Sequence, residues 1–355
     1  TSWAMILSIA TFALSMSGTF LVRSGILNSV HTFANDPERG LFILIFLFSL
    51  IFMSIFIFFF FHSNKEKTGN NFFWLSKETS ILVNNWFMMY FLSVVLIGTI
   101  YPIFLEVLTS NKISVGPPFY NKLILPFLIP FLFAMAIGPK LKWIKSDFQD
   151  KLNMLLLLII SFLISALIIK EFDISFLINT ILVSGAFFLF FVTLREFFIK
   201  KLKNLSQNVA HFGFSLLILS ILLNNIFSTE VITNLKIGET FKSDKFSISF
   251  ANINQENGKN FKSIIGKFKV EHEDGSIDAL RPELRIYNQP NIVTSEADIK
   301  TNFFTDKFIT MNYVQNQEYF NIRYQVKPLM IWIWISVLLL SFGGLMSIFK
   351  TRYEI

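Results

Sequence analysis

The chain has 355 residues, of which 53% are hydrophobic and only 15% are charged, and its mean hydropathy is +0.56. This composition excludes a soluble protein of two or three globular domains and indicates that most of the chain lies in lipid. Cysteine is absent, which excludes disulfides, thiolate metal sites and cysteine nucleophiles. The formal net charge of +7 is better explained by membrane topology than by nucleic acid, so we expect no nucleic-acid partner.

Several stretches are apolar enough to cross a bilayer as helices, which takes roughly 20 residues each. They lie near residues 3–22, 41–61, 86–108, 123–139, 152–170, 176–194, 209–227 and 328–349. Pro102 in the third span, and Pro126 and Pro130 in the fourth, predict kinks because proline removes a backbone hydrogen bond. The sequence therefore predicts a polytopic α-helical membrane protein with about eight transmembrane helices.

Lys and Arg are unevenly distributed between the short loops, and cytoplasmic loops retain an excess of them. The basic loops follow the second, fourth and sixth spans, and the C-terminal tail is basic too. This pattern predicts that both termini are cytoplasmic. It also predicts that the long hydrophilic segment before the last span lies on the outer face.

That hydrophilic segment alternates apolar and polar side chains, which is typical of strands with one buried face. The clearest runs are 246–250, 267–270 and 320–326, and turn residues stand at 256–258 and 273–275. About 100 residues is enough for an independent domain, so we expect a small β-sandwich or barrel inserted before the last helix. The predicted organisation is a helical bundle over 1–227 with an outer loop at 23–40, the β domain over 228–327, and the last helix with a cytoplasmic tail over 328–355.

The four histidines are the candidate nitrogen ligands for a metal. His62 and His272 lie in hydrophilic loops, where a solvated side chain is the ordinary interpretation. His211 lies about eight residues past Lys203, roughly 12 Å into the seventh span, and an ionisable group at that depth needs a partner. It is either a neutral imidazole hydrogen-bonded to another helix or a haem ligand, with Gly213 leaving room for the macrocycle.

His31 lies in the outer loop after the first span, together with Arg23, Arg39, Gly25 and Gly40. A loop histidine is usually solvated, and arginines at a membrane edge often only anchor helices. Arginine also pairs well with the propionate carboxylates of haem, and glycine lets a backbone approach a flat ligand. The grouping makes a binding role for His31 more plausible than spacing alone would.

The run from Gly18 to Gly40, which contains Arg23, His31 and Arg39, closely resembles a signature of the CcmF family. Members of this family are the integral membrane subunit of the bacterial system I cytochrome c haem lyase. The resemblance continues collinearly along the chain, at 98–102, 113–121, 208–213, 280–287, 332–334 and 343–345.

The resemblance implies a bacterial inner-membrane protein with a periplasmic β domain. It implies that His31 is one of two histidines that ligate the substrate haem, and that His211 is one of two that hold a haem b proposed to reduce the incoming iron. In the implied reaction, haem vinyl groups form thioethers with the cysteines of a CxxCH motif in apocytochrome c, so the thiols belong to the substrate. The implied partners are that apocytochrome, a haem chaperone, the thioreduction and apocytochrome-binding subunits of the maturation system, and membrane lipid.

Family members also carry an upstream tryptophan-rich outer segment and the second histidine of each pair. The six tryptophans of this chain form no such cluster, and Trp332 and Trp334 fit an interfacial aromatic belt. The chain begins at Thr1 without a start methionine. We therefore expect a C-terminal part, truncated or split from an upstream subunit, in which both haem sites are half-built.

Two other functions stay open from the sequence. Proline-broken helices suggest a secondary transporter, although no inverted repeat is visible and a sizeable β domain is unusual for a carrier. A membrane scaffold of an assembly complex, holding no haem, is the other alternative.

Overall fold

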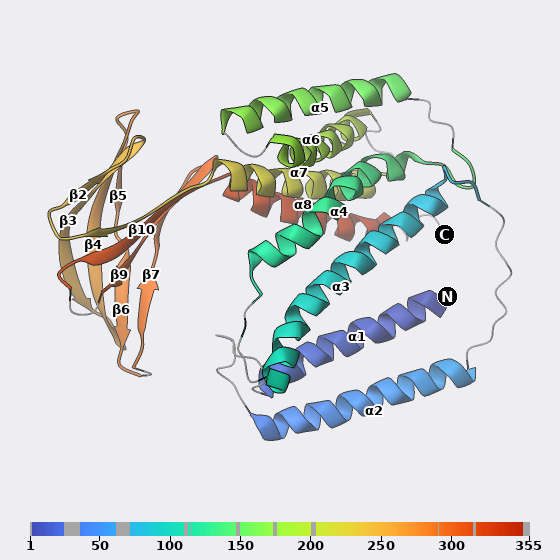
Figure 1. The fold of residues 1–355 in the computed structure, drawn as a ribbon, viewed down its shortest axis with the longest axis horizontal. Coiled ribbons are helices and arrows are strands. Elements are labelled where there is room, and N and C mark those ends of the chain that lie inside the picture. Colours follow the sequence, from blue (N-terminus) through green and yellow to red (C-terminus); the bar gives the residue numbers. More distant parts are fainter. Residues whose placement is uncertain are drawn as a thin grey trace. The chain divides into compact units, whose positions relative to one another are not determined.

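The structure is a computed structural model that describes residues 2–24, 36–61, 72–109, 113, 115–146, 150–172, 176–199, 204–289, 291–314 and 317–350. The chain divides into two compact units (Figure 1). The first comprises Thr1–Leu128 and Lys140–Asp147, and the second comprises Ile129–Pro139 and Phe148–Ile355. Each unit is described separately below.

Eight helices within the described residues are long and apolar enough to cross a membrane, which confirms the predicted spans. They are α1 (Ser2–Arg23), α2 (Pro37–Phe61), α3 (Lys77–Thr109), α4 (Pro117–Ile137), α5 (Lys151–Glu171), α6 (Phe176–Ile199), α7 (Leu205–Phe227) and α8 (Met330–Lys350), with a short 3₁₀ turn at Gly138–Lys140 after α4. Helix α3 begins at Lys77 rather than near residue 86, because Ser76 caps its polar first turn by accepting a hydrogen bond from the Thr79 N–H at 3.3 Å. It continues through Pro102.

In the first unit, α1 packs against α2, and α3 contacts the N-terminal half of α4. The Tyr90 hydroxyl of α3 donates to the Leu123 carbonyl of α4 at 3.0 Å, and the Tyr90 and Phe127 ring centroids are 4.0 Å apart. Most large side chains on α2 are exposed, as expected of a surface that faces lipid.

In the second unit, α6 is the central helix: 61% of its spanning segment is buried, compared with 28% or less for the other seven helices. It packs between α5 and α7, and α7 packs on α8. Gly185 of α6 also allows close contact with Leu132 near the end of α4, whose side chain is fully buried.

The β domain contains ten strands in the described residues, arranged as two antiparallel sheets. One sheet has the order β1 (Thr229–Leu235), β10 (Phe320–Pro328), β9 (Thr305–Tyr313) and β8 (Asp298–Thr301). The other has the order β2 (Thr240–Lys242), β3 (Phe246–Asn257), β4 (Phe261–His272), β6 (Glu283–Tyr287) and β7 (Val293–Glu296), with β5 (Ile277–Leu280) also paired to β4. The three predicted alternating runs lie in β3, β4 and β10, which confirms the predicted all-β domain.

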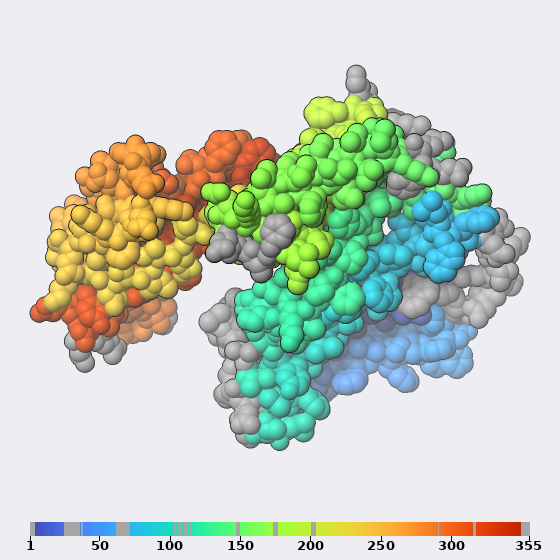
Figure 2. Space-filling view, turned by 45° about the horizontal axis from the view of Figure 1, so that its top comes forward, coloured from blue at the N-terminus to red at the C-terminus, as the bar shows by residue number. Residues whose placement is uncertain are grey.

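The inward-facing residues of both sheets form one apolar core. Phe250 of β3 and Phe268 of β4 are paired in register, and their rings stack with centroids 4.3 Å apart. Ile322 and Tyr324 of β10 close the core from the opposite sheet, both essentially fully buried. Figure 2 shows the strands, coloured yellow to orange-red, as a closely packed body.

Short connections join this sandwich to two neighbouring helices. One residue, Ser228, separates α7 from β1, and Leu329 separates β10 from α8 with a left-handed φ of 61°. The Asn224 side chain of α7 donates to the carbonyl of Pro328, and the Ser228 hydroxyl donates to the Asn224 carbonyl at 2.5 Å. Asn224 thus links the two connections, through one hydrogen bond to Ser228 and one to Pro328.

Candidate functional site

Helices α7 and α8 approach closely because small residues stand where they meet. A Cβ added to Gly213 of α7 would lie 2.8 Å from the Leu340 backbone nitrogen of α8, and one added to Gly343 would lie 2.6 Å from the Ala210 nitrogen. Glycine at a helix interface lets two backbones meet in this way. The space beside Gly213 is thus occupied by α8. The prediction that this glycine leaves room for a macrocycle is wrong, since the sequence does not say which neighbour a glycine faces.

The other side of α7 is fixed to α6 by a buried polar contact and by aromatic rings. The hydroxyls of Thr193 and Ser215 are 2.7 Å apart in the helix interface. Phe212 packs against Phe190 and Phe197, with ring centroids 5.6 and 6.0 Å away. The rotation of α7 about its axis is therefore set by α6 on one side and by α8 on the other.

His211 lies on α7 between these two packed sides. With 3.6 residues per turn, its side chain is about 160° around the helix from Gly213, and one turn before Ser215. The imidazole is partly buried, and among the described residues it has no hydrogen-bonding partner. The alternative of an imidazole hydrogen-bonded to a neighbouring helix is therefore not seen in this part of the chain.

A single imidazole in this position suits a metal cofactor whose other ligands belong mostly to the cofactor itself. Among the described residues, no three His, Asp or Glu side chains come together as a metal site. A haem needs only axial ligands from the protein, because the macrocycle supplies the other four nitrogens. A partly buried, unpartnered imidazole on a helix held from two sides fits one such axial ligand.

The predicted outer-loop site lies at the junction of α1 and α2, in the first unit. His31 and Gly25 lie outside the described residues. The Asp36 N–H donates to the Arg23 carbonyl at 3.0 Å, which brings the end of α1 next to the start of α2. Arg23 and Arg39 therefore stand at the two ends of the segment that contains His31.

Asp36 organises the start of α2. Its carboxylate accepts a hydrogen bond from the Arg39 N–H at 3.2 Å, as a helix N-cap does, and Pro37 follows as the first helical residue. The same carboxylate pairs with the Arg39 Nε at 3.0 Å, while 76% of the Arg39 side chain is exposed. Gly40 packs against Ser24, since an added Cβ would lie 3.0 Å from the Ser24 Cα. Gly40 thus serves the contact of α1 with α2, and the prediction that it lets the backbone approach a flat ligand is wrong.

Arg23 and Arg39 belong to the first unit, whereas His211 belongs to the second. They are two candidate sites. Sequence reasoning missed Thr193 and Ser215, which fix the helix that carries His211. Small hydroxyl residues within an apolar span were the available signal, because such groups need a partner in lipid.

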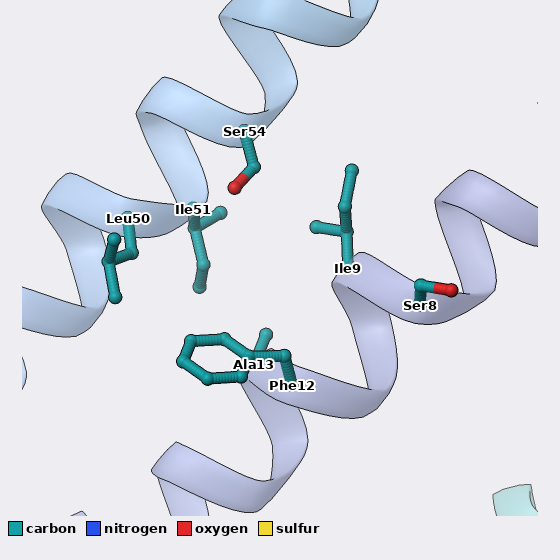
Figure 3. Close-up of a pocket in the computed structure, with 7 residues that line it drawn as sticks. All are labelled: Ser8, Ile9, Phe12, Ala13, Leu50, Ile51 and Ser54. Atoms are coloured by element: carbon teal, nitrogen blue, oxygen red, sulfur yellow. The ribbon is translucent and has the colours of Figure 1, made fainter.

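A cavity of about 240 Å³ lies between α1 and α2 (Figure 3). Its lining is mostly apolar, with Phe12 and Ile51 facing each other across it and Ser8 at its rim. The Ser8 hydroxyl already donates to the Ala4 carbonyl at 2.8 Å. None of the described residues that line this cavity is titratable.

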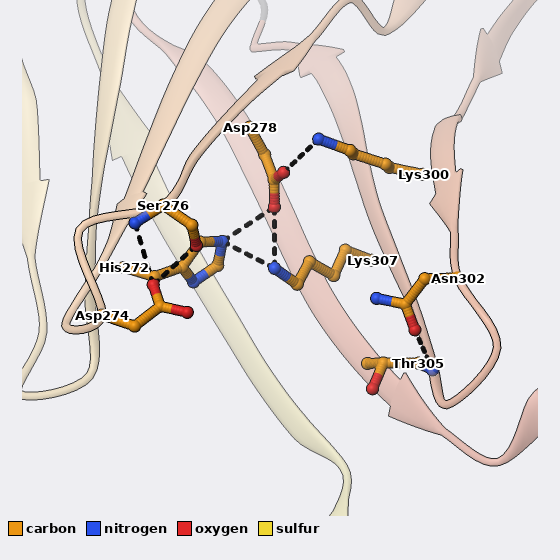
Figure 4. Close-up of polar contacts among 8 residues, drawn as sticks. All are labelled: His272, Asp274, Ser276, Asp278, Lys300, Asn302, Thr305 and Lys307. Atoms are coloured by element: carbon orange, nitrogen blue, oxygen red, sulfur yellow. Dashed lines mark hydrogen bonds and ion pairs between the residues drawn. The ribbon is translucent and has the colours of Figure 1, made fainter.

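His272 was predicted to be a solvated loop residue, and the structure contradicts this: only 14% of its side chain is exposed (Figure 4). Its Nε2 lies 2.8 Å from the Asp278 carboxylate and 3.0 Å from the Lys307 Nζ. Lysine can only donate and carboxylate can only accept. The Nε2 therefore either donates to Asp278 or accepts from Lys307, according to the tautomer of the ring.

Asp278 is the centre of this cluster, and its carboxylate is 5% exposed. It accepts hydrogen bonds from Lys300 at 2.5 Å and from Lys307 at 2.8 Å, two lysines that are directly paired on β8 and β9. Burial acts to raise the pKa of Asp278, but the hydrogen bonds from Lys300, Lys307 and His272 outweigh it, and the pKa lies well below its usual value. The cluster joins β4, β5, β8 and β9 and thereby connects the two sheets.

Similarity to known proteins extends over the whole chain. Residues 226–328 match the family model described as the CcmF C-terminal beta-sandwich, which coincides with the ten strands. All of the chain aligns with a cytochrome c-type biogenesis protein CcmF of Pseudomonas fluorescens at 32% identity. The chain is similar along its whole length to CcmF proteins.

The CcmF proteins of Haemophilus influenzae and Escherichia coli K12 are 30% and 28% identical over 99% of this chain. This chain spans 56% of the Pseudomonas fluorescens protein, 57% of the Haemophilus one and 56% of the Escherichia one. A solved structure titled Cytochrome c Heme Lyase CcmF matches 97% of this chain and 54% of its own, with a TM-score of 0.70 at 19% identity. At that identity the match concerns the fold. The chain is thus a multi-pass membrane protein with the CcmF arrangement of helices and β-sandwich.

Proposed function

We propose that this chain is part of a cytochrome c haem lyase, in which it presents haem, and reduces it, for thioether attachment to the CxxCH cysteines of apocytochrome c. The observation that carries the proposal is the partly buried imidazole of His211, which has no hydrogen-bonding partner within the part of the chain that the structure describes, on a helix fixed from two sides. The names of the relatives, cytochrome c-type biogenesis proteins, support the same activity. Similarity to these proteins along the whole chain favours it over a secondary transporter or a scaffold.

His211 would ligate the iron of a resident haem b. When bound, that haem supplies one-electron chemistry. The contribution of the chain is to position the ligand: the Thr193–Ser215 contact sets the rotation of α7, and Gly213 sets its distance from α8. The ring is only partly buried, so its nitrogens would be available to the iron of such a haem.

His31 would ligate the iron of the substrate haem, and Arg23 and Arg39 would bind its propionates. The pairing of the α1 and α2 ends places one arginine at each end of the intervening segment. Arginine forms bidentate contacts with carboxylates. The exposed Arg39 side chain, paired through its Nε with Asp36, keeps terminal nitrogens for such a contact.

We further propose that the protein lies in a bacterial inner membrane with both termini cytoplasmic, and that the sandwich at 228–327 is periplasmic. The Lys and Arg bias of the short loops supports this orientation. The second histidine of each haem site would come from the segment that precedes this region in members of the CcmF family. The other partners would be a haem chaperone, the thioreduction and apocytochrome-binding subunits, and apocytochrome c.

The test is the absorption spectrum of the chain assembled with that upstream part. We expect His211→Ala to abolish the low-spin b-type haem spectrum, because one axial ligand is lost. His62→Ala, which alters a histidine in a hydrophilic loop, is the matched control and should retain it. A normal low-spin spectrum in His211→Ala would refute the assignment of this residue. If no haem binds to the unmodified assembly, the scaffold function is the better explanation.

A further inference from the structure

Two adjacent phenylalanines form the turn between β8 and β9, outside the sandwich core. Phe303 is 52% exposed and Phe304 is 62% exposed, and their rings meet edge to face with centroids 5.1 Å apart. The Asn302 side chain accepts hydrogen bonds from the N–H groups of Phe304 and Thr305, at 2.9 and 2.7 Å (the Thr305 contact is drawn in Figure 4). This closed turn fixes the backbone and holds both rings outward.

The turn is attached to the start of α8. The Leu329 N–H donates to the Phe304 carbonyl at 2.7 Å, and the Phe303 ring lies 5.0 Å from the Trp332 ring at an angle of 73°. Trp332 is two residues into α8, or about 3 Å along the helix axis from its first residue. The phenylalanine pair is therefore held at the level where the last transmembrane span begins.

Helix α7 ends next to the start of α8. The hydrogen bond from Asn224 to the Pro328 carbonyl joins the last turn of α7 to the residues before α8. Trp334, on the first turns of α8, is 64% exposed. Tryptophan near the end of a span marks the boundary between headgroups and acyl chains. The exposed phenylalanine pair thus contacts the start of α8 through Trp332, at the end of the helix where Trp334 is exposed.

We propose that the Phe303–Phe304 turn is a lipid anchor, which inserts into the interfacial layer of the bilayer beside the start of α8. Bilayer lipid is the occupant that its position predicts, because the rings are contiguous with a membrane-spanning surface. The anchor adds a third attachment of the sandwich to the membrane, beside the two chain connections at Ser228 and Leu329. This role is independent of haem binding.

The absence of cysteine allows a direct test. A nitroxide spin label would be attached to Phe304→Cys in the full chain, reconstituted into phospholipid nanodiscs. The control is Asn312→Cys, an exposed position toward the far end of β9, roughly 26 Å away along the strand. Both side chains are exposed, so both variants should show the thermal unfolding of the unlabelled chain.

We expect the label at Phe304 to collide more often with oxygen, which partitions into lipid, than with a water-soluble nickel chelate. The label at Asn312 should show the reverse. Equal nickel accessibility at the two positions would overturn the proposal. Shielding of the Phe304 label from both reagents would also overturn it, because the turn would then be covered by protein rather than by lipid.

Discussion

Gly343 of α8 lies directly against Ala210 of α7, the residue that precedes His211: a Cβ built on the glycine would be 2.6 Å from the Ala210 nitrogen. No real Cβ occupies such a position, so a side chain at 343 forces the two helices apart. Gly344, the next residue, has nothing within 4 Å of its added Cβ. The pair of glycines therefore provides a test and its control at adjacent positions.

We predict that Gly343→Ala destabilises the second unit by roughly 2 kcal/mol, the usual cost of forcing extra volume into a packed interface. Haem affinity at His211 should fall with it. Gly344→Ala should leave stability unchanged or raise it by up to about 1 kcal/mol, because alanine favours the helix. Thermal unfolding in detergent, followed by circular dichroism, measures both. Equal behaviour of the two variants would contradict the close contact.

A second prediction concerns the Thr193–Ser215 contact. Thr193→Val and Ser215→Ala each remove one hydroxyl from the α6–α7 interface, and their double-mutant cycle isolates the interaction between them. We expect a coupling energy of about 0.6 kcal/mol, typical of interhelical hydrogen bonds in membranes. The low-spin haem signal, measured by electron paramagnetic resonance, should broaden in either variant as the His211 ring loses its fixed orientation. A coupling energy of zero would show that the hydroxyls act independently.

A third prediction separates the two haem sites. His31→Ala should leave the b-type spectrum intact and block formation of holocytochrome c, whereas His211→Ala removes the spectrum itself. Haem staining of the cytochrome product, beside the absorption spectrum of the purified assembly, distinguishes the two effects. Ser29→Ala, in the same loop, is the control. Normal cytochrome maturation in His31→Ala would refute a role in binding substrate haem.

A fourth prediction concerns Asp278, which separates two lysines on neighbouring strands. Asp278→Asn should destabilise the sandwich by about 2 kcal/mol at neutral pH, because Lys300 and Lys307 then face each other without a counter-charge. Hydrogen exchange of β9 peptides from the full chain, measured against denaturant, reports this change. Glu230→Gln, which removes an exposed partner of Arg323, should have little effect.

The pH dependence of the same cluster follows from the direction of its pKa shift. The pKa of Asp278 is lower in the folded chain than its ordinary value of 3.8, so ionised Asp278 stabilises the fold at neutral pH. That contribution is lost as the pH falls below about 3.8 and the carboxylate becomes protonated. The unmodified sandwich should therefore lose stability in acid, and Asp278→Asn should show a flatter acid dependence. An identical acid response in the two proteins would contradict the shift.

The fold could largely be predicted from the sequence. A bilayer imposes the same requirement on every span, about 20 apolar residues, so composition alone located the eight helices. The strands of the sandwich were predicted from their alternation, because one face of each is buried. The start of α3 was missed, since its first turn, Lys77 to Ser80, is polar and is helical through capping by Ser76.

The site was harder to predict, because contacts between distant segments decide it. Gly213 packs against α8, and Gly40 packs against the end of α1. The sequence around each glycine does not indicate which helix it will contact. His272 lies near a hairpin turn, which suggested solvent, yet Lys307 approaches it from a strand 35 residues later. His211 could be selected because a histidine in an apolar span is unusual whatever its neighbours are.

Only one residue, Ser228, connects α7 to the sandwich, and only one, Leu329, connects the sandwich to α8. A force applied to the sandwich, such as that of a bound polypeptide, would be transmitted as torque to the helix that carries His211, since the hydrogen bond between Asn224 and Pro328 couples both arms. A load on the β domain would therefore reach the helix that carries the imidazole through two one-residue connections.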